Sequence, residues 1–144
     1  MKTFTVETAA FSPTDLSRAG ATLLRVALGI MFIAHSVVLK YLTFTLPGTA
    51  QYFVSIGLPG FLAYVVFALE AVGGVLLVLG IRTRWVALGL VPVLLGATWV
   101  HVGNGWVFNA PNGGWEYPLF LIVTSLVVAA QAHGSNRSPS GGGN

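Results

Sequence analysis

The sequence predicts an all-α integral membrane protein: a four-helix bundle with both termini on the cytoplasmic side and short interfacial helices. Of the 144 residues, 55% are hydrophobic and only 8% are charged. A typical soluble domain has about 25% charged residues, so a soluble protein of this composition would expose large apolar patches. The apolar residues also fall into four runs, each near the length of about 20 residues that a helix needs to cross a bilayer.

The four runs form one transmembrane domain, which we place at residues 19–133. The last two runs are close to the lower length limit for a span. The expected spans lie at about residues 19–42, 60–80, 85–101 and 117–132. Little of the chain lies outside these spans, so we expect one membrane domain without a soluble domain.

The chain outside the membrane domain is short at both ends. Residues 1–18 form an N-terminal segment with a short surface helix, because Ser12, Pro13 and Asp15 suit an N-cap, the first helical position and a capping box. Residues 134–144 are rich in glycine, serine and asparagine, a composition that predicts a disordered tail.

The positive charges indicate the orientation in the membrane. An even number of spans puts both termini on one side, and that side holds every Lys and Arg residue except Lys40. Cytoplasmic loops carry an excess of Lys and Arg, so both termini are expected in the cytoplasm. The cations are dispersed and form no basic run, so we expect a bilayer rather than nucleic acid as the partner. The expected location is the cytoplasmic (inner) membrane of a bacterium or archaeon, with a multi-pass topology.

The two outward loops are expected to carry structure of their own. Residues 49–57 are long enough for two turns of interfacial helix, which Gly57 and Pro59 would end. Residues 104–115 form an aromatic-rich loop between turn signals, and we expect this loop to fold back over the bundle. Small residues at helical spacing predict close contacts between the spans. They are Gly73, Gly80, Gly89 and Gly96.

Glu70 is the most informative residue, because it lies near the bilayer midplane in the second span. A carboxylate at this depth costs about 2.5 to 3.5 kcal/mol on insertion scales. The side chain is therefore expected to face the first span and to find a cation or a hydrogen-bond donor there. Ionisable residues inside a membrane are functional candidates by default.

Four more ionisable side chains lie in the same outer half of the bundle. They are His35 and Lys40 on the first span, His101 at the end of the third span and Glu116 at the start of the fourth. Together with Glu70 they predict a cleft that opens outward, ends near the midplane and is capped by the loop at residues 104–115. Trp106 of that loop is a candidate wall of the cleft. We consider these six residues candidates for ligand binding and for proton exchange, and we assign no catalytic role.

Two other interpretations of these residues stay open. Pairs such as Glu70 with His35 or Lys40 can lock helices in register without any ligand. Two histidines and two carboxylates can also bind a metal ion. Their spacing matches no metal-binding motif, however, so no metal site is predicted.

The order of several short motifs resembles the DoxX family of small four-span membrane proteins. The motifs are LRVALG (24–29), AHSVVLK (34–40), GLP (57–59), LEAVGG (69–74), LGIRTR (79–84), HVGNGW (101–106) and GGWEYP (113–118). Together they cover about residues 22–132. One departure is Ser36, where the family commonly has glycine, but serine is still small enough for close helix packing.

The resemblance implies a membrane subunit that is part of, or accessory to, a quinone-linked redox complex of the thiosulfate:quinone oxidoreductase type. It also implies quinone as a non-covalently bound candidate cofactor, and other membrane subunits or further copies of this chain as partners. The chain has no cysteine and therefore no thiolate for an electron relay of its own. The alternative function is a non-catalytic scaffold, assembly factor or small-molecule-binding protein in which the polar residues are structural.

Overall fold

A computed structural model describes residues 12–134 and contains no strand over that range. This finding confirms the all-α class. The first helix, α1 (Pro13–Ile33), continues directly into a π-helix, η1 (Ala34–Thr43). The later elements are α2 (Leu46–Ser55), α3 (Phe61–Leu79), α4 (Thr83–His101), the 3-10 helix η2 (Val102–Asn104) and α5 (Glu116–Gly134).

Three helical segments are long and apolar enough to cross a membrane. They are Pro13–Thr43, Phe61–Leu79 and Thr83–Asn104. The apolar stretch of α5, Glu116–Ala132, is shorter. Three of the four expected spans therefore have the required length and composition, and a fourth crossing by α5 stays a prediction.

The start of α1 follows the helix-start pattern of the sequence. The Ser12 hydroxyl accepts a hydrogen bond from the Asp15 backbone N–H at 3.2 Å and donates one to the Asp15 carboxylate at 2.7 Å. The helix then runs without a break into the first span, so the expected short surface helix is the first part of one long helix. Residues 1–11 and the tail expected at 134–144 lie outside the described residues, apart from Gly134, which ends α5.

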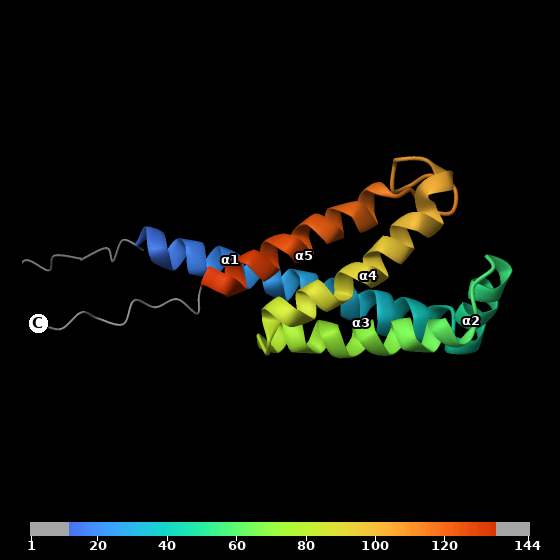
Figure 1. Ribbon diagram of the computed structural model, residues 1–144, viewed down its shortest axis with the longest axis horizontal. Helices are drawn as coiled ribbons and strands as arrows, with labels where there is room; N and C mark the ends of the chain where they lie inside the picture. Colours follow the sequence, from blue (N-terminus) through green and yellow to red (C-terminus); the bar gives the residue numbers. More distant parts are fainter. Residues whose placement is uncertain (1–11, 135–144) are drawn as a thin grey trace, which may run out of the picture.

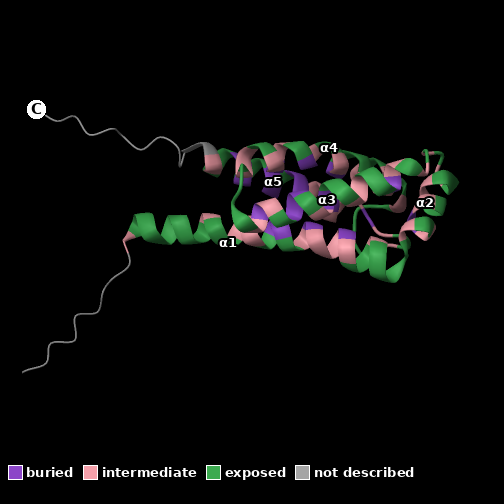
Figure 2. Ribbon diagram, turned by 90° about the horizontal axis from the view of Figure 1, so that it is seen from below, coloured by how far each residue is buried: buried purple, intermediate pink, exposed green. Residues whose placement is uncertain are grey.

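The long helices alternate in direction. The start of α1, the turn between α3 and α4, and the end of α5 lie towards one end of the molecule, and α2 and the loop before α5 lie at the other (Figure 1). α1 packs along α3, α4 packs along α5, and contacts between α3 and α4 join the two pairs. The first turns of α1 extend beyond the other helices and are exposed (Figure 2).

The buried core lies between the four long helices, and the outside of the bundle is apolar. Leu28 and Phe32 of α1 form one cluster with Leu77 of α3 and with apolar residues of α4 and α5. Large apolar side chains are also exposed on every long helix, among them Leu23, Val72, Leu95 and Phe120. An apolar outer surface of this kind is suited to lipid.

Glycines allow α1 and α3 to approach closely. A Cβ atom placed on Gly29 would lie 2.7 Å from the Gly74 carbonyl oxygen, and one on Gly74 would lie 2.8 Å from the Gly29 carbonyl oxygen. Gly73 likewise leaves room for Leu90 of α4. The expected contacts at Gly89 and Gly96 of α4 are not found, because a Cβ atom on either would meet nothing within 4 Å.

Arg25 of α1 caps the last turn of α3. Its guanidinium donates hydrogen bonds to the carbonyl oxygens of Leu77 and Val78, the second at 2.9 Å. Helix carbonyls lack backbone donors in the last turn, and a cation there also interacts favourably with the helix dipole. Gly80 ends α3 with a φ of +75° and leaves space for the guanidinium. The sequence linked Arg25 only to membrane orientation, so this contact was missed.

Candidate functional site

The centre of the candidate site is an ion pair between Lys40 of η1 and Glu70 of α3. The Lys40 Nζ atom lies 2.6 Å from Glu70 Oε2. Glu70 is only 6% exposed, so the carboxylate lies inside the bundle and faces the first span, as expected. Removing a carboxylate from water is unfavourable unless a partner compensates, and Lys40 supplies that compensation.

The winding of η1 places Lys40 beside Glu70. A π-helix has hydrogen bonds between residues i and i+5, usually occurs as a single-turn bulge and is frequent at functional sites. Here it extends over ten residues, with Phe44 N–H bonded to the Leu39 carbonyl at 2.8 Å at its end. The Lys40 Nζ atom also lies 3.5 Å from the carbonyl oxygen of His35, five residues earlier.

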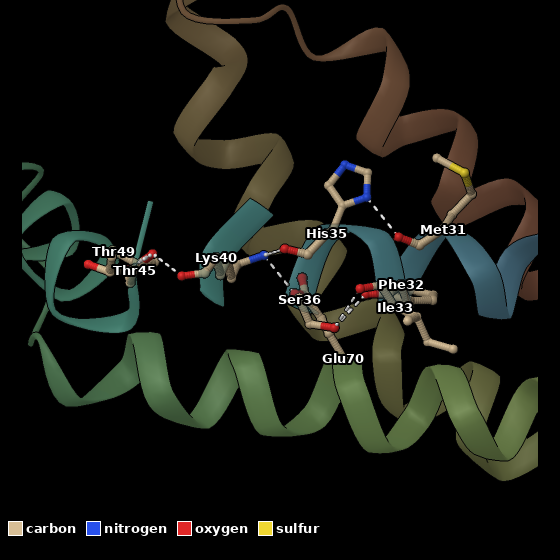
Figure 3. Close-up of polar contacts among 9 residues, drawn as sticks. All are labelled: Met31, Phe32, Ile33, His35, Ser36, Lys40, Thr45, Thr49 and Glu70. Carbon is tan, nitrogen blue, oxygen red and sulfur yellow. Dashed lines mark hydrogen bonds and ion pairs between the residues drawn. The ribbon is translucent and has the colours of Figure 1, made fainter. Parts of the chain in front are cut away.

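Short helix α2 is joined to the end of η1 by threonine side chains. The buried Thr49 hydroxyl donates to the Thr45 carbonyl at 2.9 Å and to the Lys40 carbonyl at 3.3 Å. The Thr45 hydroxyl in turn caps α2 by accepting from Gly48 N–H at 3.2 Å. These contacts fix the backbone at Lys40 (Figure 3). The helix expected at residues 49–57 is present and runs from Leu46 to Ser55, and its place at the membrane interface stays a prediction.

His35 points away from the ion pair. Its Nδ1 atom lies 2.8 Å from the Met31 carbonyl oxygen, and its ring projects on the side of η1 opposite Glu70 (Figure 3). The ring stacks on Tyr117 of α5, with 5.6 Å between centroids and 24° between planes. The structure therefore pairs Glu70 with Lys40 rather than with His35.

The other three candidate residues lie in or beside the loop between α4 and α5. Glu116 Oε1 accepts a hydrogen bond from Phe108 N–H at 2.9 Å. His101 Nδ1 lies 2.8 Å from the Ala97 carbonyl oxygen, and the His101 ring faces Gly113. Trp106 packs edge-on against Trp115 at 4.4 Å between centroids. These contacts fold the loop back on itself, and they do not join the three residues to Glu70.

An aromatic groove of about 470 Å³ lies where this loop meets α5. Its lining residues are Trp106, Phe108, Glu116, Tyr117, Leu119, Phe120 and Val123. Tyr117 links the groove to His35, because the same ring lines the groove and stacks on the histidine. The Tyr117 hydroxyl is buried and has no hydrogen-bond partner among residues 12–134.

Sequence reasoning did not name Tyr117 as a candidate site residue. The sequence spacing does indicate that Tyr117 faces the bundle, because it shares a helix face with the buried residues Leu121 and Ser125, four and eight positions later. Among residues 12–134, no three His, Asp or Glu side chains lie close enough together to hold a metal ion.

Comparison with known proteins identifies the family. Residues 20–103 match the family model described as DoxX. This chain belongs to the DoxX family. The match confirms the resemblance that the motifs indicated. It begins within α1 and ends within η2, so it includes the Lys40–Glu70 pair but ends before the aromatic loop.

One curated relative of this DoxX-family chain is a protein of Bacillus subtilis (strain 168) named "Putative oxidoreductase CatD". The two sequences are 40% identical over 111 residues, which cover 76% of this chain and 77% of the relative. No solved structure matches the chain. Together with the apolar helices, the family match indicates a membrane protein.

Proposed function

We propose that this DoxX-family protein is a quinone-binding membrane subunit of, or accessory to, a quinone-linked redox complex. The observation that carries the proposal is the buried Lys40–Glu70 pair. Charged residues inside a membrane are expensive and mark proton relays and substrate sites. Reduction of a quinone takes up protons, and an amine and a carboxylate are groups that exchange them. The printed name of the Bacillus relative supports a redox association.

The aromatic groove suits the ring of a quinone. Small-molecule sites are mostly apolar, with a few polar groups that set orientation. The faces of Trp106, Phe108 and Tyr117 can pack on a flat ring, and the Tyr117 hydroxyl is a polar group without a partner in the described chain. Phe120 and Val123 are exposed on the outside of α5, so the groove is accessible from the lipid phase. A bound quinone supplies two-electron redox chemistry.

A partner subunit completes the proposed complex. The chain has no cysteine, so electron carriers held by thiolates belong to that partner. In the proposed complex, this chain binds the lipid-soluble quinone, keeps water away from it and holds exchangeable protons at Lys40 and Glu70. The partner can be a different membrane protein or a membrane-associated enzyme.

We also propose that α5 is a fourth span and that both termini lie in the cytoplasm of the host cell. The start of α1 and the end of α5 lie towards one end of the molecule (Figure 1), together with Arg25 and the Arg82–Arg84 turn. A reporter fused after Gly134 tests the topology. We expect green fluorescent protein to fluoresce there and alkaline phosphatase to be inactive, with the opposite result for reporters inserted at Asn109. Active phosphatase after Gly134 would refute this orientation.

The quinone proposal predicts different effects for the two outer carboxylates. The full chain, purified in nanodiscs formed from host membranes, is expected to retain quinone that extraction and mass spectrometry can measure. Glu70→Gln should lower this retained quinone several-fold, because Lys40 loses its partner and η1, whose His35 ring stacks on Tyr117 of the groove, loses this link to α3. Glu116→Gln should lower it less, because the glutamine oxygen can still accept from Phe108 N–H.

A charge-neutral variant separates binding from folding in this experiment. Lys40→Met/Glu70→Gln leaves no unpaired charge, so circular dichroism should show a folded helical protein that still retains little quinone. Absence of quinone from the wild-type protein, or equal retention by wild type and both glutamate variants, would contradict the proposal.

A second candidate function is a membrane scaffold, and one set of contacts favours it. The continuous helix formed by α1 and η1 contacts α3 through two side chains. Arg25 bonds to the last turn of α3, and Lys40 pairs with Glu70. Contacts of this kind fix helix register without a ligand. A protein partner that co-purifies with the chain in the absence of quinone would support the scaffold.

A further inference from the structure

A carboxylate without a cationic partner lines the aromatic groove. Glu116 is the first residue of α5, where neutral pH and the positive end of the helix dipole both favour the charged form of a carboxyl group. Its Oε1 atom accepts from Phe108 N–H at 2.9 Å, and no donor among residues 12–134 bonds to Oε2. Glu116 takes part in no ion pair within that range, and residues 85–134 contain no lysine or arginine. The groove therefore offers a carboxylate oxygen to a cation from outside the chain.

Exposed aromatic rings lie beside this carboxylate. Trp106 and Phe108 line the groove together with Glu116, and both rings are exposed. The edge-on contact between Trp106 and Trp115 helps to hold the first ring in place. The face of an aromatic ring carries negative charge density, and groups of such rings bind ammonium ligands. The rings and the carboxylate therefore favour the same kind of ligand group, an ammonium.

The position of the groove along α5 indicates the source of the ammonium. The apolar stretch of α5 begins at Glu116, so the carboxylate lies at the polar end of an apolar helix. Phe120 and Val123, one and two turns further along, line the same groove and are exposed. Tryptophan is enriched at the depth of the lipid headgroups, and Trp106 is at this end of the helix. A lipid with its headgroup at Glu116 has an apolar surface beside its chains.

We propose that the rim of the aromatic groove, formed by Trp106, Phe108 and Glu116, binds the primary ammonium of an amine-bearing phospholipid such as phosphatidylethanolamine. The ammonium donates to Glu116 Oε2 and packs against the two rings, and an acyl chain lies along the exposed apolar residues of α5. This inference goes beyond the proposed function and is independent of the buried ion pair. Because the proposed quinone ring packs on the same side chains, the lipid and the quinone compete for the groove.

Two variants change the rim with little change to the fold. Glu116→Gln removes the negative charge, and the glutamine oxygen can still accept from Phe108 N–H. Phe108→Leu removes one ring face and keeps an apolar side chain. Phe61→Leu is the matched control for the ring, because Phe61 at the start of α3 is 65% exposed, close to the 64% of Phe108, and does not line the groove.

The test is native mass spectrometry of lipid binding to the full chain in detergent. The ligands are phosphatidylethanolamine, its N-acetyl derivative, which has the same chains but no positive charge, and glycerophosphoethanolamine, which has the headgroup but no chains. We expect the wild-type protein to bind phosphatidylethanolamine about tenfold more tightly than the N-acetyl lipid, and to bind the headgroup alone far more weakly. Glu116→Gln should abolish the preference between the two lipids. Phe108→Leu should reduce it about threefold, and Phe61→Leu should leave it unchanged.

Several outcomes would overturn this inference. They are equal affinity of the wild-type protein for the two lipids, no binding of either lipid, and a preference that survives in Glu116→Gln. Equal preferences in Phe108→Leu and Phe61→Leu would show that the ring does not contact the ammonium. Glycerophosphoethanolamine that binds as tightly as the lipid would indicate a site for a free amine and overturn the assignment to a lipid. The proposed function is tested separately, by the quinone that Glu70→Gln retains, so neither experiment decides the other.

Discussion

Lys40→Met is expected to destabilise the bundle by about 3 to 5 kcal/mol, the loss typical when one partner of a buried ion pair is removed. Methionine keeps most of the volume of the lysine side chain, so the loss comes from Glu70, whose carboxylate is left inside the bundle without its cation at 2.6 Å. Denaturant unfolding in one detergent, followed by circular dichroism, measures the effect.

The double variant Lys40→Met/Glu70→Gln shows whether the loss belongs to the pair. Replacing both partners of a buried ion pair with neutral residues is often close to neutral, so most of the stability should return. The double-mutant cycle then gives a coupling energy between the two residues. A Lys40→Met protein as stable as the wild type would show that the ion pair does not form in the folded protein.

Gly74→Leu is expected to destabilise the protein by about 3 kcal/mol, at the upper end of the usual range for overpacking. The new side chain would meet the backbone of Gly29, where even a Cβ atom lies 2.8 Å from a carbonyl oxygen. Backbone cannot move aside as a flexible side chain can, so α1 and α3 would have to separate. The same unfolding measurement applies.

Gly96→Leu is the matched control for the glycine contact. Gly96 also lies within a long helix, but a Cβ atom there would meet nothing within 4 Å, so leucine should change the unfolding free energy little. Equal losses for the two variants would mean that helix propensity or membrane insertion, and not contact between α1 and α3, determines the result.

Local and compositional features of the fold could be predicted from the sequence. The cap at Ser12, the apolar spans and the helix before Gly57 follow from short-range patterns of residue type. The burial of Glu70 follows from the unfavourable transfer of a carboxylate into lipid. Each of these features depends either on residues that are close together in the chain or on the polarity of a single side chain. Both can be seen in the sequence.

The partners within the site could not be predicted in the same way. The sequence left Glu70 with either His35 or Lys40 as its partner, because it shows no sign of the π-helix that decides between them. The stack of His35 on Tyr117 joins two helices far apart in the chain, so its geometry depends on how those helices cross. Glu116 bonds to the backbone of its own loop, a contact that residue type alone does not indicate.

The two-turn π-helix makes the ion pair depend on chain length as well as on residue identity. Lys40 reaches Glu70 because five-residue intervals set its direction after His35. Ordinary α-helical winding of the same five-residue interval would turn the lysine to another face, whereas deleting one residue together with that winding would keep it on nearly the same face, because four residues of α-helix and five of π-helix each make just over one turn. Two relatives that share this lysine and glutamate therefore share the ion pair only if the winding of the helix matches the length of the interval between the histidine and the lysine. An insertion or deletion in this interval changes the ion pair unless the winding of the helix changes with it.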